Sequence, residues 1–303
     1  MSAPPKKRDP RMGLRTSATL ATVFVILGQT VFGFEQSVAQ VFVCVGTGWA
    51  CALFFEWVDA KASGDVPGYL GGGFKKLVDW MLSAHMTSIT LSFLLYYNRR
   101  LWVAAFTVAL ALGSKYLFRV RVNGHLKHFM NPSNFGIAVV LLTFQWVGLL
   151  PWGWTINLHG SWDWIVPLII TALGLRLNLL FTGRLPLIAS WLGAFILQGA
   201  FRSWRMDTPL VGQLVVLTGI AMVLFTLYMI TDPQTSPSRP RSQVIFGVGV
   251  ALAYSILFDL HVQYTMFYAV TVVCAIRGVV LYVASRRQPA AQPEVLTAAA
   301  AAG

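Results

Sequence analysis

Ten long apolar stretches follow one another along the 303-residue chain, and most are long enough to cross the ~30 Å hydrocarbon core of a bilayer. Only 11% of the residues are charged, whereas a soluble domain carries about 25%. A single globular core has no room for so much apolar surface, which argues against a soluble α/β enzyme. The sequence therefore predicts an integral membrane protein.

The stretches are continuously apolar and do not alternate in polarity, which favours helices over a transmembrane β-barrel. We therefore predict an all-α, polytopic membrane protein of about ten transmembrane helices. The predicted spans are residues 14–33, 37–58, 78–97, 101–118, 134–152, 162–181, 184–200, 208–230, 243–259 and 264–285. The seventh span is the weakest prediction, because it is short and begins near Pro186.

The distribution of Lys and Arg predicts the orientation. With the N-terminus inside, 19 of the 23 basic residues fall on the cytoplasmic side, and Arg99, Arg100, Arg202 and Arg205 fall outside. This favours a multi-pass protein of the plasma membrane with both termini in the cytoplasm. Because the basic residues sit at loop ends, we expect the net charge of +12 to face the lipid bilayer, and we expect no nucleic-acid partner.

The chain divides into a basic cytoplasmic tail (residues 1–13), a transmembrane helical domain (14–286) and a disordered C-terminal tail (287–303). The basic start resembles a signal peptide, but the apolar stretch after it is long. We therefore expect an uncleaved first span.

The cysteine and histidine spacings predict no metal centre. Cys44, Cys51 and Cys274 form no Cys-x-x-Cys motif, so neither an iron–sulfur cluster nor a disulfide framework is indicated. His125 and His128 have a His-x-x-His spacing, but the neighbouring Gly124 and its turn chemistry argue against a helix there. Positioning or headgroup contact is the preferred interpretation of these two histidines.

Tryptophans crowd the loop between the fifth and sixth spans. They are Trp146, Trp152, Trp154, Trp162 and Trp164. This favours an interfacial belt at the outer face, and the alternative is a stacking box for an aromatic ligand.

A polar loop precedes the fifth span. Asn131 and Pro132 suit the N-cap and the first position of a helix. Ser133, Asn134 and Gly136 follow at once, and the glycine allows a backbone or a ligand to approach closely. The simpler interpretation is a well-capped helix; the functional one is a helix N-terminus exposed to a buried ligand.

A second polar loop, on the same predicted side, contains Thr231, Asp232 and Thr235. An ordinary solvated turn is the simpler interpretation. Arg277, two turns from the inner end of the last span, is an ionisable residue inside the bilayer and needs a partner. We expect Arg277 to lie near Asp232, and we expect the two loops to build one cytoplasmic pocket.

Two motifs, "HFMNPSNFGIAVVLL" and "MITDPQTSP" followed by "IFG", resemble the Asn-Pro and Thr-Asp-Pro segments of the RnfD/NqrB-like family. This family comprises related membrane subunits of the sodium-pumping NADH:quinone reductase and of the Rnf complex. More narrowly, "FRVRVNGHLKHFMNPSNFGIAV" resembles the short UnbU-type proteins found beside enediyne biosynthesis genes. The resemblance covers residues ~80 to 285, and about thirty of them carry the motifs.

The resemblance implies flavin-linked electron transfer across a membrane by two inverted five-helix halves. Family members hold FMN on a Thr of a Ser-Gly-Ala-Thr motif at the outer side. The nearest match here, "TSATLAT" around Thr19, lies at the predicted inner side and in the wrong order. We therefore expect FMN or riboflavin to be held noncovalently by Asn131, Ser133, Asn134, Gly136, Thr231, Asp232, Thr235 and Arg277.

Two functions stay open at this point. The first is a redox component that binds a flavin or a quinone, or that works beside a redox partner protein or other membrane subunits. The second is a cofactor-free carrier or channel for a small molecule or an ion. A membrane scaffold for a biosynthetic assembly is a third, and the sequence identifies no catalytic residue.

Overall fold

The computed structural model describes residues 10–122, 125–149 and 157–287. Within these ranges, six helices are long and apolar enough to cross a membrane, or seven if a bent pair counts as one span. The structure is thus compatible with an integral membrane protein, as the composition predicts. The count of ten spans stays a prediction. The predicted tails fall largely on residues 1–9 and 288–303, which lie outside the described ranges.

Each of the first five predicted spans contains a helix. The elements are α1 (Pro10–Leu27) with the π-helical turn η1 (Gly28–Phe32), α2 (Val38–Ser63), α3 (Gly73–Leu94), α4 (Leu101–Leu117) and α5 (Pro132–Thr143). The predicted fifth span, 134–152, is the main departure. Helix α5 has 12 residues and therefore rises only about 18 Å, which is too short for a complete crossing.

Helix α5 ends at Thr143 because the backbone that follows it forms hydrogen bonds with another segment of the chain. After a turn in which Val147 N donates to Phe144 O, strand β4 (Gly148–Leu149) pairs antiparallel with β1 (Leu95–Tyr96). A second antiparallel pair joins β2 (Arg119–Val122) to β3 (His125–His128). The histidine pair thus lies in a strand, as its turn chemistry indicates, and not on a helix.

The C-terminal half contains the other predicted spans. Its elements are α6 (Trp162–Leu177) with the π-helical turn η2 (Asn178–Thr182), α7 (Leu185–Met206), α8 (Leu210–Leu214), η3 (Val215–Thr218), α9 (Ile220–Leu224), η4 (Phe225–Met229), α10 (Pro240–Asp259) and α11 (Thr265–Arg287). Helix α7 is longer than the predicted 184–200, because Arg202 and Arg205 belong to its last turns and are not in a loop. The predicted eighth span is broken, with a bend of 65° between 210–218 and 220–229.

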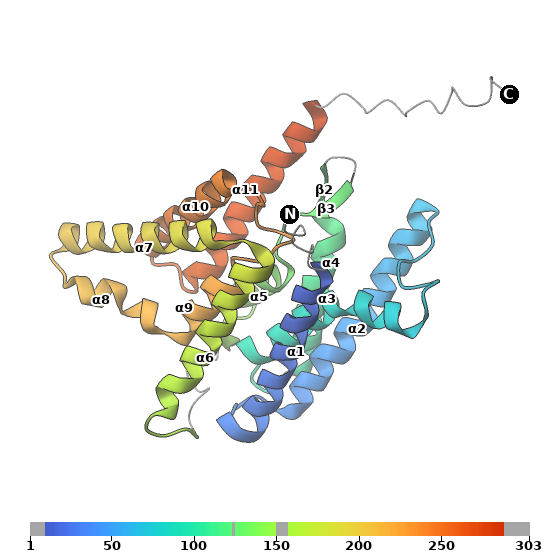
Figure 1. Cartoon of the computed structure of the whole chain (residues 1–303), viewed down its shortest axis with the longest axis horizontal. Helices are drawn as coiled ribbons and strands as arrows, with labels where there is room; N and C mark the ends of the chain where they lie inside the picture. The colour runs from blue at the N-terminus through green and yellow to red at the C-terminus, as the bar shows by residue number, and fades with distance from the viewer. Residues whose placement is uncertain (1–9, 123–124, 150–156, 288–303) are drawn as a thin grey trace, which may run out of the picture.

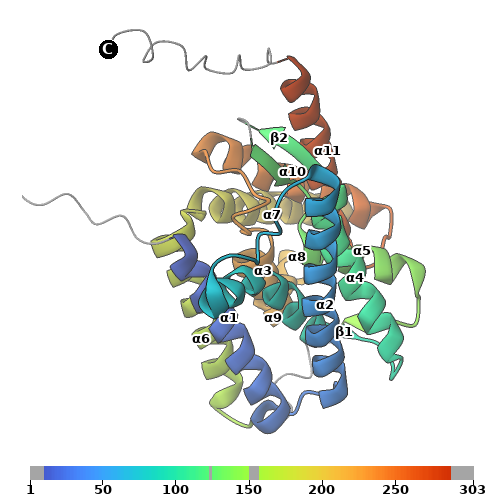
Figure 2. The ribbon, with the colours of Figure 1, turned by 90° about the vertical axis from the view of Figure 1, so that its right-hand side faces the viewer.

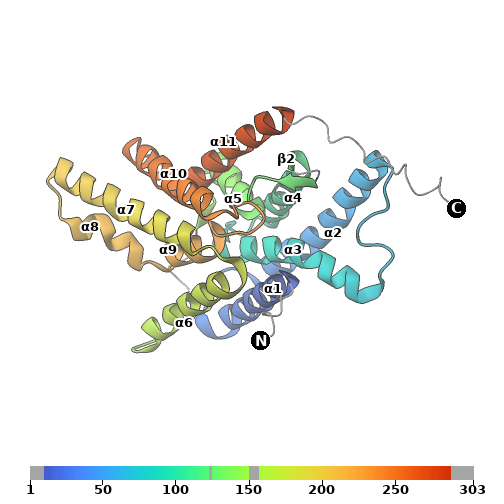
Figure 3. The same ribbon diagram turned by 45° about the horizontal axis from the view of Figure 1, so that its top comes forward.

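The two halves lie side by side around a shared centre. Helices α2 and α3 lie on one side, α7 and α8 lie on the other, and α5 and α11 lie between them (Figure 3). Helices α1 and α6 flank the same side of the bundle (Figure 2). The N-terminal end of α1, the C-terminal end of α11 and the β2–β3 hairpin all point toward the top of Figure 1.

Several charged side chains near the helix ends form ion pairs with side chains of opposite charge. The contacts are Arg15–Asp79 and Arg119–Asp59, each at 2.5 Å, and Arg202–Asp259 at 3.4 Å with Arg205–Asp259 at 3.2 Å. Glu56, which we expected to pair with a basic loop, instead accepts from Gly68 N and from the Tyr116 hydroxyl. These contacts tie neighbouring helices of each half together.

Helices α7 and α10 pack closely because Gly247 has no side chain. A Cβ at this position would lie 2.8 Å from Leu187 O and 3.0 Å from Trp191 N. Both are backbone atoms of α7, so the helices would have to move apart to admit it. Small residues allow such close backbone approach between membrane helices.

We predict that Gly247→Ala destabilises the protein by about 1–3 kcal/mol, because it overpacks this crossing. The matched control is Gly249→Ala on the same helix, where the nearest side-chain atom, of Val273, would lie 3.8 Å from the added Cβ. Thermal unfolding in detergent, followed by tryptophan fluorescence, compares the two. Equal unfolding temperatures for both variants would contradict the close-packing account.

Candidate functional site

The start of helix α5 is built as its sequence predicts. Asn131 is the N-cap, and its Oδ1 accepts a hydrogen bond from Asn134 N at 3.0 Å. Pro132 occupies the first helical position, where a missing N–H costs nothing. One half of the Asn131 amide therefore caps the helix and leaves the Nδ2 hydrogens for another partner.

That other partner lies on the second polar loop. Asn131 Nδ2 donates to Met229 O at 3.1 Å and lies 3.5 Å from Asp232 Oδ2. Asn131 and Met229 are 98 residues apart in the sequence and belong to different halves. Asn131 is buried. The prediction that the two loops come together therefore agrees with the structure; their role as a ligand site stays a prediction.

The loop that follows η4 is folded around the Asp232 carboxylate. Its Oδ2 accepts from the Thr235 hydroxyl at 2.8 Å, and its Oδ1 accepts from Gln234 N at 3.2 Å. The Ser236 hydroxyl donates to Asp232 O at 2.6 Å. Such local bonds are typical of Asp in turns. Thr231 is buried, and its hydroxyl donates back to Leu227 O.

The side chain of Asn134 contacts helix α11. Its Nδ2 donates to Phe267 O at 2.9 Å and to the Thr271 hydroxyl at 2.8 Å. Its Oδ1 is buried and has no hydrogen-bond partner among the described residues. A buried acceptor without a donor costs about 1–3 kcal/mol, so this oxygen marks a place where a donor group would be favourable.

Gly136 and Ser133 contribute less to the junction. A Cβ at Gly136 would lie 2.9 Å from Ala111 Cβ and 3.2 Å from Thr107 O, so helix α4 fills the space that the glycine leaves. Of the two alternatives, the structure thus shows close approach of a neighbouring helix. Ser133 is half-buried, and its hydroxyl bonds to no residue within the described ranges.

Arg277 reaches the loop, but not through the expected ion pair. Its Nη1 donates to Thr235 O at 2.5 Å, and no salt bridge to Asp232 forms among the described residues. Asp232 instead accepts bonds from Thr235 and Gln234 of its own turn. Arg277 therefore fixes the loop backbone, while the carboxylate stays in the turn.

Several residues of the junction are missing from the predicted set. Arg184 donates from Nη2 to Pro233 O at 3.2 Å. Gln243 donates to Gly183 O and to Ser238 O, and Asn178 donates to Gly174 O and Leu227 O. Asn178 and Gln243 are isolated amides next to apolar stretches. That pattern in a membrane helix is the signal that would have pointed to them.

Basic groups surround the carboxylate of Asp232 at the junction. Burial lowers the pKa of His128 to about 4, and the positive charges of Lys115 and Arg119 add to this effect, while Asp232 opposes it. Burial also lowers the pKa of Arg184, and Asp232 again opposes the shift. Asp232 therefore lies within electrostatic range of basic groups from separate segments of the chain.

Within the described ranges, no group of three or more His, Cys, Asp or Glu could hold a metal ion.

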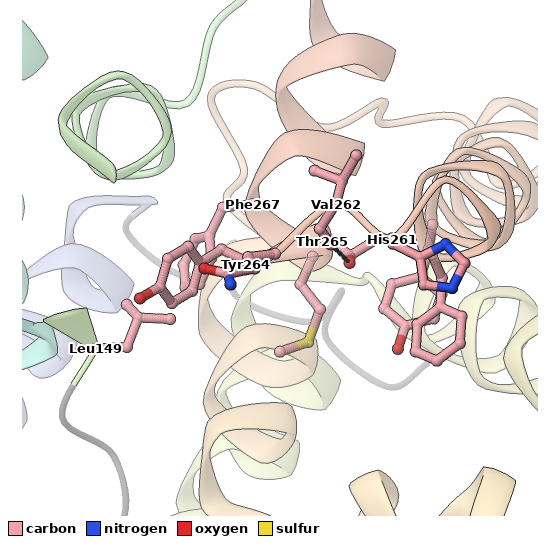
Figure 4. A pocket seen from close by; sticks show the side chains of 10 residues that line it. Leu149, His261, Val262, Tyr264, Thr265 and Phe267 are labelled. Atoms are coloured by element: carbon pink, nitrogen blue, oxygen red, sulfur yellow. Dashed lines mark hydrogen bonds between the residues drawn. The ribbon is translucent and has the colours of Figure 1, made fainter. Parts of the chain in front are cut away.

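A hollow of about 450 Å³ lies where helix α10 turns into α11, and one of its lining residues, Phe267, accepts the bond from Asn134 Nδ2 through its backbone carbonyl. Its lining includes Leu149, Tyr254, Phe258, His261, Tyr264 and Phe267 (Figure 4). None of the predicted ligand residues lines this hollow.

The described tryptophans of the predicted belt lie at the surface in two cases: Trp162 and Trp164 are exposed, and Trp146 packs against Arg100 at 4.4 Å. Trp152 and Trp154 lie outside the described residues.

Comparison of the sequence with protein-family models and with curated proteins found no match.

The lowered pKa of His128 predicts a pH dependence of stability. Its unfolded pKa is about 6.5, so between pH 6.5 and 4 the unfolded chain takes up a proton that the folded protein does not. Stability should therefore fall as the pH drops through this window, by at most about 1.4 kcal/mol per pH unit. Near pH 8, well above the unfolded pKa, the histidine is neutral in both states and contributes no change.

The measurement is the unfolding temperature in detergent at about pH 8, 6.5 and 5, which brackets the unfolded pKa of histidine. His128→Gln should flatten the acid side of the wild-type profile, whereas His125→Gln, at an exposed position of the same strand, should leave it intact. A profile that both variants share with the wild type would contradict the assignment to His128.

Proposed function

We propose that this chain is an RnfD/NqrB-like protein of the plasma membrane that supports flavin- or quinone-linked electron transfer. Its site is the junction of the α5 N-terminus with the loop after η4. The observation that carries the proposal is the bond from Asn131 Nδ2 to Met229 O. It brings together the two segments whose motifs resemble that family, although 98 residues separate the bonded pair.

The groups at the junction fit the polar edge of a flavin. A flavin ring presents one N–H donor between two carbonyl acceptors, and a bound flavin supplies a ring that accepts and releases electrons. The buried, unpartnered Oδ1 of Asn134 is an acceptor that suits such an N–H. The guanidinium groups of Arg184 and Arg277 are donors that suit carbonyl oxygens. The ligand would be held noncovalently, because the nearest match to the family's attachment motif, around Thr19, differs from it in order along the chain and in predicted side.

The junction would face the cytoplasm, with both termini on the same side. This orientation is supported by the uneven distribution of Lys and Arg. It is also supported by the common direction of the start of α1, the end of α11 and the hairpin (Figure 1). A redox partner protein or another membrane subunit would then exchange electrons at this face.

The proposed fold is a pair of inverted five-helix repeats. In support, α1 and α6 both end in a five-residue π-helical turn closed by a left-handed glycine, Gly33 or Gly183. Each turn is followed by a long helix, α2 or α7. An odd number of spans per repeat inverts the second relative to the first.

The biological setting that we propose is enediyne natural-product biosynthesis. It rests on the narrower resemblance of residues 118–139 to UnbU-type proteins.

The test is flavin binding by purified protein, measured by absorbance, with in-gel fluorescence after denaturation to detect covalent attachment. We expect a yellow protein with flavin near equimolar amount and no fluorescent band. Asn131→Ser keeps a good N-cap but removes the Nδ2 donor, and Asp232→Ala removes the carboxylate that folds the loop. Both should lose most of the flavin while still inserting into the membrane.

Matched controls are Asn157→Ala and Asp163→Ala, two exposed positions near the start of α6, and both should keep the wild-type flavin content. Full flavin content in Asn131→Ser and Asp232→Ala would overturn the junction as the site. A colourless wild type that carries solute into liposomes would instead establish the cofactor-free carrier.

A further inference from the structure

Two arginines from different elements converge on one short stretch of the loop after η4. Arg184, which directly precedes α7, donates from Nη2 to Pro233 O at 3.2 Å. Arg277 of α11 donates from Nη1 to Thr235 O at 2.5 Å. The two acceptor carbonyls are two residues apart, so both guanidinium groups lie beside the same turn.

Among the described residues, no carboxylate lies within 4 Å of either guanidinium group. The nearest acid in the sequence of the loop, Asp232, is occupied by Thr235, Gln234 and Asn131. By contrast, the arginines at positions 15, 119 and 202 are each paired with an Asp. The junction therefore carries more positive charge than the one carboxylate of Asp232, which lies within electrostatic range of Arg184, balances among the described residues.

Most donors of these two guanidinium groups are unused. A guanidinium group carries five N–H donors, and within the described ranges each of the two arginines makes a single hydrogen bond. Arg184 is only 5% exposed, and its Nε is buried without an acceptor among the described residues. A buried cation is costly unless a charge and hydrogen bonds compensate it. This unpartnered, buried donor is the observation that points to a ligand.

Other groups add to the same preference. Lys115 of helix α4 bonds through its Nζ to the Ser83 hydroxyl at 2.9 Å, and its charge lies within electrostatic range of Asp232. Helix α10 begins next to the loop, at Pro240, and no side chain of the described residues caps its N-terminus. A free helix N-terminus favours anions. The planar fork of an arginine suits bidentate binding of phosphate oxygens in particular.

We propose that Arg184 and Arg277 form a binding site for a phosphate monoester at the cytoplasmic junction. The phosphate can belong to a soluble ligand, such as FMN, or to a lipid headgroup of the inner leaflet. For the flavin, this inference rests on the proposed function, and it selects FMN over riboflavin. The anion site itself depends only on the two arginines.

The first experiment uses inorganic phosphate as the probe, on the full chain in lipid-free detergent at constant ionic strength. The unfolding temperature of the wild type should rise with phosphate concentration, because a ligand that binds only the folded state stabilises it. Arg184→Gln and Arg277→Gln should abolish the rise. Arg176→Gln, which removes an exposed charge from α6, is the matched control and should keep it.

If Arg184→Gln does not fold, Arg277→Lys carries the test. This variant keeps the positive charge but loses the planar fork of the guanidinium group. We expect it to need about ten times more phosphate for the same rise in unfolding temperature, because one charge-assisted hydrogen bond is lost. An unchanged phosphate response in both Arg277 variants would overturn the proposal. A wild type that responds neither to inorganic phosphate nor to a phosphate-bearing lipid would overturn it as well.

The second experiment separates the sources of the phosphate. FMN should bind the wild type at least about tenfold more tightly than riboflavin, because its phosphate gains at least one charge-assisted hydrogen bond. Arg277→Gln should remove this preference. In nanodiscs, phosphatidic acid should raise the unfolding temperature relative to phosphatidylcholine if a lipid supplies the phosphate, and this rise should also require Arg277.

The outcomes distinguish the inference from the proposed function. If neither flavin binds but phosphate or phosphatidic acid stabilises the protein through the arginines, the flavin function fails and the anion site stands. If FMN and riboflavin bind equally and no phosphate probe stabilises the protein, the anion site is wrong and the arginines only anchor the loop.

Discussion

The structure depends on side-chain donors that bond to the backbone carbonyls left without helical partners where membrane helices end or break. Inside a bilayer no water can satisfy these groups. Buried amide side chains do so here: Gln40 donates to Ser92 O and Leu95 O at the end of α3, and Asn131 donates to Met229 O at the end of η4. At both places an Asn or Gln from another segment reaches the irregular backbone. The candidate site lies at one of them.

This constraint also explains why the site is made from distant parts of the chain. An amide that satisfies a broken helix has to come from a neighbouring segment, and at the junction the neighbour is the opposite half. Asn131 thus has two tasks, since one side of its amide caps α5 and the other holds the carbonyl end of η4. The junction is the geometric consequence of two helix ends that bond to one amide side chain.

The sequence predicts much of this fold for clear physical reasons. Long apolar runs locate the helices, and Asn131–Pro132 locates the start of α5, because capping chemistry is local. The end of α5 is not predictable in this way. Residues 144–149 are apolar enough to continue a helix, but β4 finds a partner in β1, a tertiary contact that no local pattern encodes.

The site shows the same division. The two loops are predictable from their Asn, Asp and Pro residues, and the structure brings them together. The role of Arg184 is not predictable, because a single Arg between two spans looks like any other cytoplasmic charge. Only the packing reveals that it is buried. The bond of Arg277 to a backbone carbonyl likewise depends on the folded path of the loop, which places Thr235 O beside Arg277 while Asp232 bonds within its own turn.

The bent pair of the C-terminal half has a consequence of its own. Segments α8 and η3 bury none of their residues against the rest of the described chain, whereas η4 buries four of its five. The stretch 210–218 is held mainly by α7, where Leu214 lies against Gly199 and Gln213 accepts from Arg202. Its outward side chains would therefore meet lipid and not protein, while the segment that meets Asn131 stays inside the bundle.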